Sequence, residues 1–214
     1  RLMSRTAYVN GRYVRHPAAR VHVEERGYQI ADGVYEVCAV RGGELIDEAP
    51  HMKRLERSLG ELRIKQPMGM AQLAHVMRET VRRNRVRDGI VYLQITRGVA
   101  RRDHPFPQGD VRPSLVVTAR NLPVERYDAW AERGVAAILV PETRWARCDI
   151  KSTALLANVL AKQQAREAKA FEAWFVDRDG FVTEGSSTNA WSVDADGVLK
   201  TRRLDHAILP GVTR

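Results

Sequence analysis

Two side chains of this sequence, Lys151 and Glu184, combine a type and a setting that could carry out a reaction. Lys151 lies in the segment Arg147–Ser152, where an apolar run and a short connector give way to a long segment of helical composition. Glu184 lies further along the chain, in a turn rich in Gly, Ser and Thr. A lysine amine can form a Schiff base with an aldehyde, and a carboxylate can keep a pyridine nitrogen protonated so that the ring withdraws electrons. The pair therefore fits a site for pyridoxal phosphate (PLP).

Lys151 differs from the other lysines of the chain in its neighbours. It combines apolar neighbours with a position between two predicted elements, where loss of water would favour the neutral, reactive amine. The others lie around predicted helices or at the end of a predicted strand: Lys53, Lys65, Lys162, Lys169 and Lys200. Spacing alone leaves an ordinary lysine at the start of a helix as an equally good interpretation of Lys151.

The composition is typical of a soluble globular protein. Of the 214 residues, 44% are hydrophobic and 29% are charged, which fits one large domain or two small ones. No apolar run reaches the length of a membrane-spanning helix, and the N-terminal residues do not resemble a signal peptide. The two cysteines, Cys38 and Cys148, are too few for a disulfide framework and predict free thiols in the cytoplasm. The spacing of His, Cys, Asp and Glu indicates no metal site.

The net charge of +9 raises the question of nucleic-acid binding. The basic residues are scattered among acidic ones, and the densest cluster, residues 82–87, fits a solvated helix end. Basic motifs with interleaved aromatic residues are absent. We therefore expect no nucleic-acid partner, and expect the charge to favour anionic substrates and a phosphorylated cofactor. A basic binding protein without catalytic activity is the alternative from another functional class.

The pattern of elements predicts an α+β fold with two domains. The N-terminal domain, residues 5–120, begins with an Asn-Gly hairpin at Tyr8–Val14. Residues 121–126 lack periodicity, contain a proline and are predicted as the linker. The remaining elements of the N-terminal domain are expected to be strands at 33–40, 90–96 and 114–118, and helices beginning near Pro50 and Met70.

The C-terminal domain, residues 127–214, is expected to combine one helix with several short strands. A strand is predicted near 135–140, followed by an Ala- and Leu-rich helix from about Thr153 to Lys169. Strands with tight turns follow at 171–176, 181–183 and 188–193.

A set of motifs runs in order through the chain from Tyr8: Arg26–Gln29, Asp32–Val37, His51–Leu55, Gln94–Gly98, Arg102–His104, Arg147–Ser152, Val182–Ser187 and Ile208–Arg214. This set resembles the motifs of the fold-type IV PLP-dependent aminotransferases, and most closely those of the D-amino-acid aminotransferases. The resemblance implies two domains with PLP at their interface, and it favours the Schiff-base interpretation of Lys151. Family members continue beyond Arg214 with further strands and a second phosphate-binding loop, so the C-terminal domain is expected to be truncated relative to the family.

The resemblance implies a role in cofactor binding for five residues. Lys151 is expected to form the Schiff base and then to move the substrate's α-proton, and Glu184 is expected to pair with the pyridine nitrogen. Arg54 is expected to contact the phosphate, where a guanidinium can bind through two nitrogens. Val212 and Thr213 match the segment that offers backbone and hydroxyl donors to the same phosphate, at an expected helix start.

The resemblance also implies three residues of the substrate pocket. Tyr35 matches a tyrosine that lines the pocket, and Arg102 and His104 match the pair that receives the substrate α-carboxylate. Without the resemblance, Arg54 would be interpreted as a surface arginine, Tyr35 as a core aromatic and His104 as an ordinary loop histidine. The hydroxyl residues Ser186, Ser187 and Thr188 are interpreted as turn residues that bond to local backbone groups.

The implied reaction is a ping-pong transamination of D-amino acids, with D-alanine and 2-oxoglutarate giving pyruvate and D-glutamate. The implied assembly is a homodimer in which the Arg102–His104 loop reaches the neighbouring subunit. Three other activities of the fold share the lysine and the glutamate: branched-chain aminotransferase, R-selective amine transaminase and aminodeoxychorismate lyase. The Arg102 and His104 pair favours the D-specific activity, because a cationic pair on that loop suits the carboxylate of the D-enantiomer.

Overall fold

The computed structural model describes residues 5–214, which divide into two compact units. Unit 1 comprises the chain up to Val124 together with Lys151–Ala154, and unit 2 comprises Glu125–Ile150 and Leu155–Arg214. The division at Val124 falls inside the segment expected to be a linker, 121–126, most of which belongs to a strand end and a helix start. Lys151–Ala154 group with unit 1, whereas the sequence placed them in the C-terminal domain.

Unit 1 is built on a six-stranded antiparallel sheet with the order β2-β1-β6-β5-β3-β4. The predicted hairpin is confirmed, since β1 pairs with β2 across Asn10 and Gly11, which both have positive φ angles (47° and 98°) as a two-residue turn requires. The strands are β1 (Thr6–Val9), β2 (Arg12–Arg15), β3 (Gly33–Arg41), β4 (Glu44–Leu45), β5 (Gly89–Thr96) and β6 (Ser114–Asn121).

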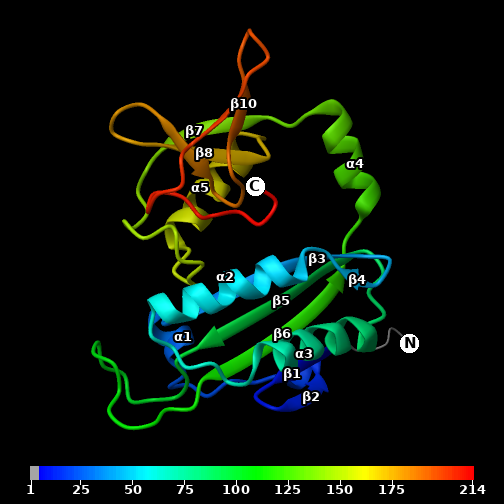
Figure 1. The fold of residues 1–214 in the computed structure, drawn as a ribbon, viewed down its shortest axis with the longest axis vertical. Helices are drawn as coiled ribbons and strands as arrows, with labels where there is room; N and C mark the ends of the chain where they lie inside the picture. The colour runs from blue at the N-terminus through cyan, green and yellow to red at the C-terminus, as the bar shows by residue number, and fades with distance from the viewer. Residues whose placement is uncertain (1–4) are drawn as a thin grey trace. The chain divides into compact units, whose positions relative to one another are not determined.

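Two amphipathic helices, α2 (Glu48–Glu61) and α3 (Met70–Arg83), lie along the sheet of unit 1 (Figure 1). Helix α2 packs on β3, and α3 packs on β6, β1 and β5. Their apolar residues recur every three or four positions, so that one stripe of each helix is buried against the strands. The core includes Leu55, Leu59, Leu73, Met77, Val91, Leu93, Ile95 and Leu115.

Unit 1 also contains two short helices that the sequence did not predict, η1 (His16–Ala18) and α1 (Arg26–Ile30). A helix of five residues is too short to show the apolar periodicity from which helices are predicted. Helix α1 begins at a side-chain cap, where the Glu25 carboxylate accepts a hydrogen bond from the Tyr28 N–H (2.8 Å). It ends at Ala31, whose φ of 56° turns the chain into β3.

Unit 2 contains a three-stranded sheet with the order β7-β8-β9. Strands β7 (Ala137–Pro141) and β8 (Glu172–Val176) are parallel, and helix α5 (Leu156–Glu167) lies between them in the sequence, as a parallel connection requires. Strand β9 (Val182–Gly185) is antiparallel to β8. The buried core is formed by Val140, Ala161, Ala165, Ala173 and Phe175.

Three further elements belong to the second half of the chain. Helix α4 (Val124–Arg133) was not predicted, and it buries no residue. Strand β10 (Trp191–Val193) forms a hairpin with β11 (Leu199–Thr201), and the strand that the sequence predicted to end just before Lys200 instead continues through that residue. Among the described residues, no helix is long and apolar enough to cross a membrane.

The predicted helix start at Thr153 is wrong, because α5 begins at Leu156. Residues 151–153 instead run beside the first residues of β3. The Tyr35 N–H donates to the Lys151 carbonyl (3.0 Å), and the Thr153 N–H donates to the Gly33 carbonyl (2.9 Å). These long-range bonds replace the local bonds of a helix, so the lysine lies in a strand-like segment rather than at a helix cap.

Candidate active site

Lys151 is held through its main chain in unit 1. Besides the bond to Tyr35, its N–H donates to the Ser58 hydroxyl of α2 (3.4 Å), and its neighbour Ser152 forms a bridge with Val34. The side chain is half-buried, and its amine lies 4.4 Å from the centre of the Tyr35 ring. The backbone from which the amine extends is therefore held by β3 and α2.

Tyr35, predicted to line the substrate pocket, forms an aromatic pair with Tyr92 on the neighbouring strand. The ring centres are 5.7 Å apart and the rings are stacked. The Tyr92 hydroxyl donates to Gln94 Oε1 (2.6 Å), and burial raises the pKa of Tyr92 to about 12. The Tyr92 phenol therefore stays protonated at neutral pH, and the structure brings Tyr35 and Lys151 together as the resemblance implied.

Arg54 binds a buried carboxylate next to Lys151, which the sequence did not predict. Its Nε and Nη2 donate to the two oxygens of Glu36 (2.8 and 2.7 Å), and His51 Nδ1 contacts Glu36 Oε2 (2.8 Å). Burial alone would raise the pKa of Glu36. The hydrogen bonds from Arg54 and His51, helped by the charge of Lys151, hold it below its ordinary value. Glu36 is therefore an anion that orients the Arg54 guanidinium.

The interpretation of Arg54 as a surface residue is wrong, since its side chain is only 10% exposed. His51 and Arg54 lie three positions apart on α2, which places both on the face that covers β3. One signal could have found Glu36. A carboxylate at an inward-facing position of an apolar strand needs a cationic partner, and two candidates lay in the next helix.

Arg102 and His104 lie in the loop between β5 and β6, and both side chains are exposed. The Asp103 carboxylate accepts a hydrogen bond from the His104 N–H (2.8 Å), which bends the loop between Arg102 and His104. An exposed guanidinium and an exposed imidazole are suited to bind an anion that arrives from outside the unit.

Glu184 lies on β9 in unit 2 and is buried. One carboxylate oxygen accepts a hydrogen bond from Arg144, and the other accepts from Asn189 Nδ2 (3.0 Å) and from the Leu209 N–H (3.1 Å). Burial raises the pKa of Glu184 above its ordinary value, although the Arg144 charge opposes this shift. The result is a carboxylate with a fixed orientation and an increased affinity for a proton.

Arg144 is the residue that links Glu184 to its surroundings. Its guanidinium also donates to Glu142 (2.6 Å) and to the Ala207 carbonyl (3.1 Å), and lies 4.4 Å from the centre of the Phe175 ring. No pattern of residues indicated Arg144 in advance, because it lies in an irregular connector where spacing predicts nothing.

Val212 and Thr213, predicted to bind phosphate, lie in a turn closed by a hydrogen bond from the Arg214 N–H to the Gly211 carbonyl (3.3 Å). The helix start expected at these residues stays a prediction. Asn189 connects Glu184 to the segment that leads into this turn, because its amide donates both to Glu184 and to the Leu209 carbonyl (3.0 Å). A side chain at Gly211 would collide with Asn189 Oδ1, so the Asn189 side chain would have to move away from its present partners.

The three hydroxyls of the 186–188 turn bind a carboxylate rather than the local backbone, so their first interpretation is wrong. Glu172 on β8 is buried and accepts hydrogen bonds from Ser186, from Ser187 (2.8 Å) and from Thr188 (3.1 Å). Lys162 on α5 completes the cluster, 3.1 Å from Glu172. The cluster fastens the turn after β9, and so it holds Glu184 at the end of that strand.

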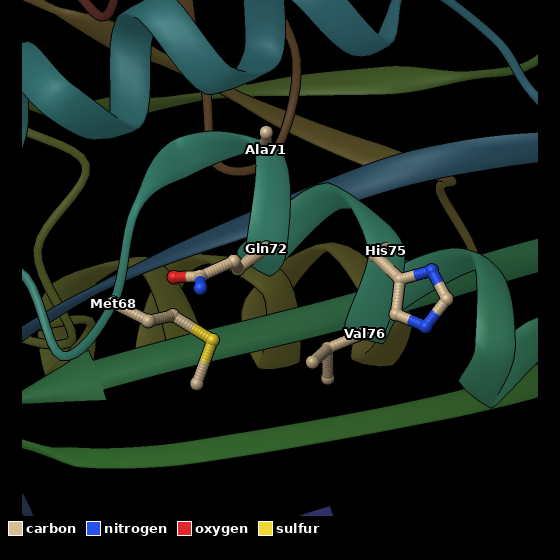
Figure 2. A pocket seen from close by; sticks show the side chains of 5 residues that line it. All are labelled: Met68, Ala71, Gln72, His75 and Val76. Carbon is tan, nitrogen blue, oxygen red and sulfur yellow. The ribbon is translucent and has the colours of Figure 1, made fainter.

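The predicted site residues do not line the hollow beside α3. This cavity of about 410 Å³ is lined by Met68, Ala71, Gln72, His75 and Val76 (Figure 2). Its walls are mainly apolar, and it contains neither a lysine nor a carboxylate. Within residues 5–214, no group of three or more His, Cys, Asp or Glu side chains could hold a metal ion.

Comparison with known proteins identifies the family. The sequence profile described as amino-transferase class IV matches residues 33–214. The D-alanine aminotransferase of Bacillus licheniformis is 43% identical over 205 residues, which cover 96% of this chain and 71% of the relative. The D-alanine aminotransferase of Staphylococcus aureus strain MSSA476 is 40% identical over 207 residues, covering 97% and 72%.

The chain belongs to the class IV aminotransferases. A solved structure of the same fold is the branched-chain amino acid aminotransferase of Escherichia coli, with a TM-score of 0.85 and 24% identity over 98% of this chain and 71% of that one. The predicted fold class, α+β of fold type IV, is confirmed. Family membership also identifies the chain as an aminotransferase, and so removes the alternative of a basic protein without catalytic activity.

Proposed function

We propose that this class IV aminotransferase transfers amino groups from D-amino acids to 2-oxo acids with PLP as cofactor. D-Alanine and 2-oxoglutarate are the proposed substrates, and pyruvate and D-glutamate the products. The observation that carries the proposal is the Lys151 amine, which lies over the Tyr35 ring on a backbone bonded to β3. The similarity to two D-alanine aminotransferases supports the choice of substrate.

The side chains in each unit fit PLP by their chemistry. PLP supplies an aldehyde carbon, an anionic phosphate and a pyridine ring that withdraws electrons from the reacting carbon. In unit 1, Lys151 offers an amine for the aldehyde and Arg54 a guanidinium for the phosphate. In unit 2, Glu184 offers a buried carboxylate for the ring nitrogen, and Val212 and Thr213 offer donors for the phosphate.

The Arg54 and Glu184 side chains are each held in one orientation by neighbouring side chains. Glu36 fixes the Arg54 guanidinium through two nitrogens, so little side-chain freedom remains to be lost on phosphate binding. Arg144 and Asn189 fix the Glu184 carboxylate, and its raised pKa favours a proton shared with the ring nitrogen. Lys151 is proposed to accept the substrate's α-proton and to return it on the same face.

The branched-chain alternative rests on a weaker likeness. The branched-chain aminotransferases of known structure that share this fold are 23–26% identical to the chain, against 40–43% for the two D-alanine aminotransferases. The Arg102 and His104 pair supports the D-specific activity, because a guanidinium and an imidazole on one exposed loop can hold an α-carboxylate on one side of the pocket. That placement decides which enantiomer presents its α-proton to Lys151.

The proposal is tested by comparing two enantiomers as amino donors. Purified protein loaded with PLP is expected to transfer the amino group of D-alanine to 2-oxoglutarate much faster than that of L-leucine. The measurement is kcat/KM for each donor from the oxo acid released. A faster reaction with L-leucine would reverse the assignment in favour of a branched-chain aminotransferase, and an inability to bind PLP would reject both.

We also propose a homodimer in which the Arg102–His104 loop completes the carboxylate site of the neighbouring subunit. Arg102→Ala alone is expected to lower kcat/KM for D-alanine by roughly ten- to a hundredfold, the loss of one charge-assisted contact, with PLP binding unchanged. Mixed dimers of Arg102→Ala with Lys151→Ala chains are expected to be more active than either parent, because one hybrid site then contains both residues. Activity in isolated mixed dimers no higher than in either parent dimer would show that each subunit builds its own site.

A further inference from the structure

The loop that carries Arg102 and His104 has almost no regular structure of its own. Between β5 and β6 it contains one isolated bridge, from Val99 to Glu25, and otherwise turns and bends. The placement of Arg102 and His104 must therefore come from contacts with the rest of unit 1. One exposed contact is the pair of Lys65 and Asp110. The least exposed contacts come from three charged residues whose side chains are at most 11% exposed, Arg26, Asp32 and Arg97, which we call the Asp32 cluster.

The base of the loop is closed by main-chain contacts. Gly98 has a φ of +107°, and a side chain there would collide with the carbonyl of Arg112 at the other end of the loop. The Arg26 N–H donates to the Gly98 carbonyl (2.9 Å), and the Ala100 N–H donates to the Glu24 carbonyl (3.2 Å). The two ends of the loop thus meet against the residues that begin α1.

Arg26 reaches from this base to the middle of the loop. Its side chain is 2% exposed; Nε donates to Asp32 Oδ2 (2.8 Å), and Nη1 donates to the carbonyl of Asp103 (2.8 Å). Asp103 is the residue between the two proposed carboxylate-binding side chains. One guanidinium therefore ties the main chain at the midpoint of the pair to a carboxylate in unit 1.

Arg97 holds a second point of the loop. Its guanidinium donates to both oxygens of Asp32 (2.7 and 3.0 Å) and lies 3.7 Å from the centre of the Phe106 ring. The carbonyls of Leu62 and Arg63, after α2, accept its remaining hydrogen bonds (2.8 and 3.0 Å). Asp32 is thus shared by two guanidiniums, and each of them contacts the loop on its other side.

The charges of the Asp32 cluster restrict the movement of its side chains. Two buried guanidiniums share one carboxylate, so main-chain carbonyls must satisfy their other donors. A lysine could not replace Arg26, because one ammonium group cannot reproduce the spacing of the two guanidinium nitrogens that bind Asp32 and Asp103. The spacing of the guanidinium nitrogens therefore contributes to holding the loop in place.

We infer that the Asp32 cluster sets the position of Arg102 and His104, and so determines how well the enzyme recognises the substrate carboxylate. Arg26 is then a positioning residue for substrate selectivity, although it need not touch the substrate. This inference rests on the proposed function. It predicts a defect confined to donors that carry a carboxylate, whereas a purely structural role predicts loss of all activities together.

The test compares Arg26→Lys with wild type for D-alanine and for D-alaninol, which lacks the carboxylate. Arg26→Lys keeps the positive charge beside Asp32 and loses the bond to Asp103. We expect single-turnover kcat/KM for D-alanine to fall on the order of tenfold, the effect of losing one hydrogen bond of about 1.4 kcal/mol, with D-alaninol and PLP binding unchanged. Amide hydrogen exchange is expected to be faster in residues 99–111. Arg120→Lys, at an exposed arginine of β6, is the matched control.

Phe106→Leu provides a second variant in case Arg26→Lys does not fold. Phe106 is 45% exposed, so its replacement leaves the core intact while removing the ring from Arg97. The same faster exchange and the same carboxylate-specific defect are expected. Unchanged amide hydrogen exchange in residues 99–111 would refute the attachment of the loop to the Asp32 cluster. Faster exchange with an unchanged ratio of D-alanine to D-alaninol rates would refute the positioning role. If wild-type protein does not react with D-alanine, the proposed function fails and the positioning role with it. The exchange comparison would still show whether the Asp32 cluster holds the loop in place.

Discussion

Lys151→Ala is expected to remove transamination and the yellow colour of PLP bound to the protein. The variant loses both the amine that holds the aldehyde and the group that moves the α-proton, and a positioned acid–base group alone contributes about 10²–10⁴-fold. The fold should survive, because the bonds that attach this segment to β3 and α2 come from the main chain of Lys151. The measurements are the visible spectrum after PLP addition and the rate of pyruvate formation.

Lys53→Ala is the matched control for this experiment. Lys53 is exposed on α2, so its loss should leave both colour and rate unchanged. A Lys151→Ala protein that is yellow and active would refute the assignment of the lysine. A Lys53→Ala protein with the same loss would show that the defect has another cause.

Glu184→Gln is expected to lower kcat by roughly 10²–10³-fold, the effect of removing one preorganised electrostatic group, while weakening PLP binding far less. The carboxylate charge favours a protonated ring nitrogen mainly when negative charge develops on the reacting carbon. Binding depends more on the proposed phosphate contacts of Arg54, Val212 and Thr213, which the substitution leaves in place. The two quantities to measure are kcat and the dissociation constant of PLP.

Glu142→Gln is the control that distinguishes the electrostatic role of Glu184 from an effect of Glu184 on the packing of Arg144. Glu142 binds the same guanidinium as Glu184, so both substitutions remove a carboxylate from Arg144. Only the change at Glu184 is expected to produce the large fall in kcat. Loss of cofactor in Glu184→Gln, with normal turnover of the fraction that keeps it, would make Glu184 a structural residue.

The sequence predicted the elements whose apolar residues repeat with a clear period. Helices α2 and α3 bury one stripe each, and the hairpin at Asn10 depends on a two-residue turn, so local patterns decide both. The segment 151–154 could not be predicted in this way. Its conformation depends on hydrogen bonds to Gly33 and Tyr35, which are distant in sequence, and local composition suggested a helix instead.

The same distinction applies to the candidate site. Lys151 and Glu184 could be found because their residue types suggest a reaction, and the resemblance supplied Arg54, Tyr35 and the pair on the loop. The residues that orient them could not be found, because each acts through one partner far along the chain. Arg144, for example, gains its importance from a hydrogen bond to a carboxylate forty residues later, which no spacing rule connects to it.

The grouping of Lys151–Ala154 with unit 1 has a consequence for dividing this protein into parts. The residues on both sides of this short segment belong to unit 2, so the chain passes between the units at three places. A fragment ending at Val124 would contain Tyr35, Glu36 and Arg54 but not the amine that lies beside them. The complementary fragment would contain the lysine without the strand that fixes its backbone. Neither half could therefore serve as a self-sufficient module, and a gene fusion or split at this boundary would separate the reactive group from its support.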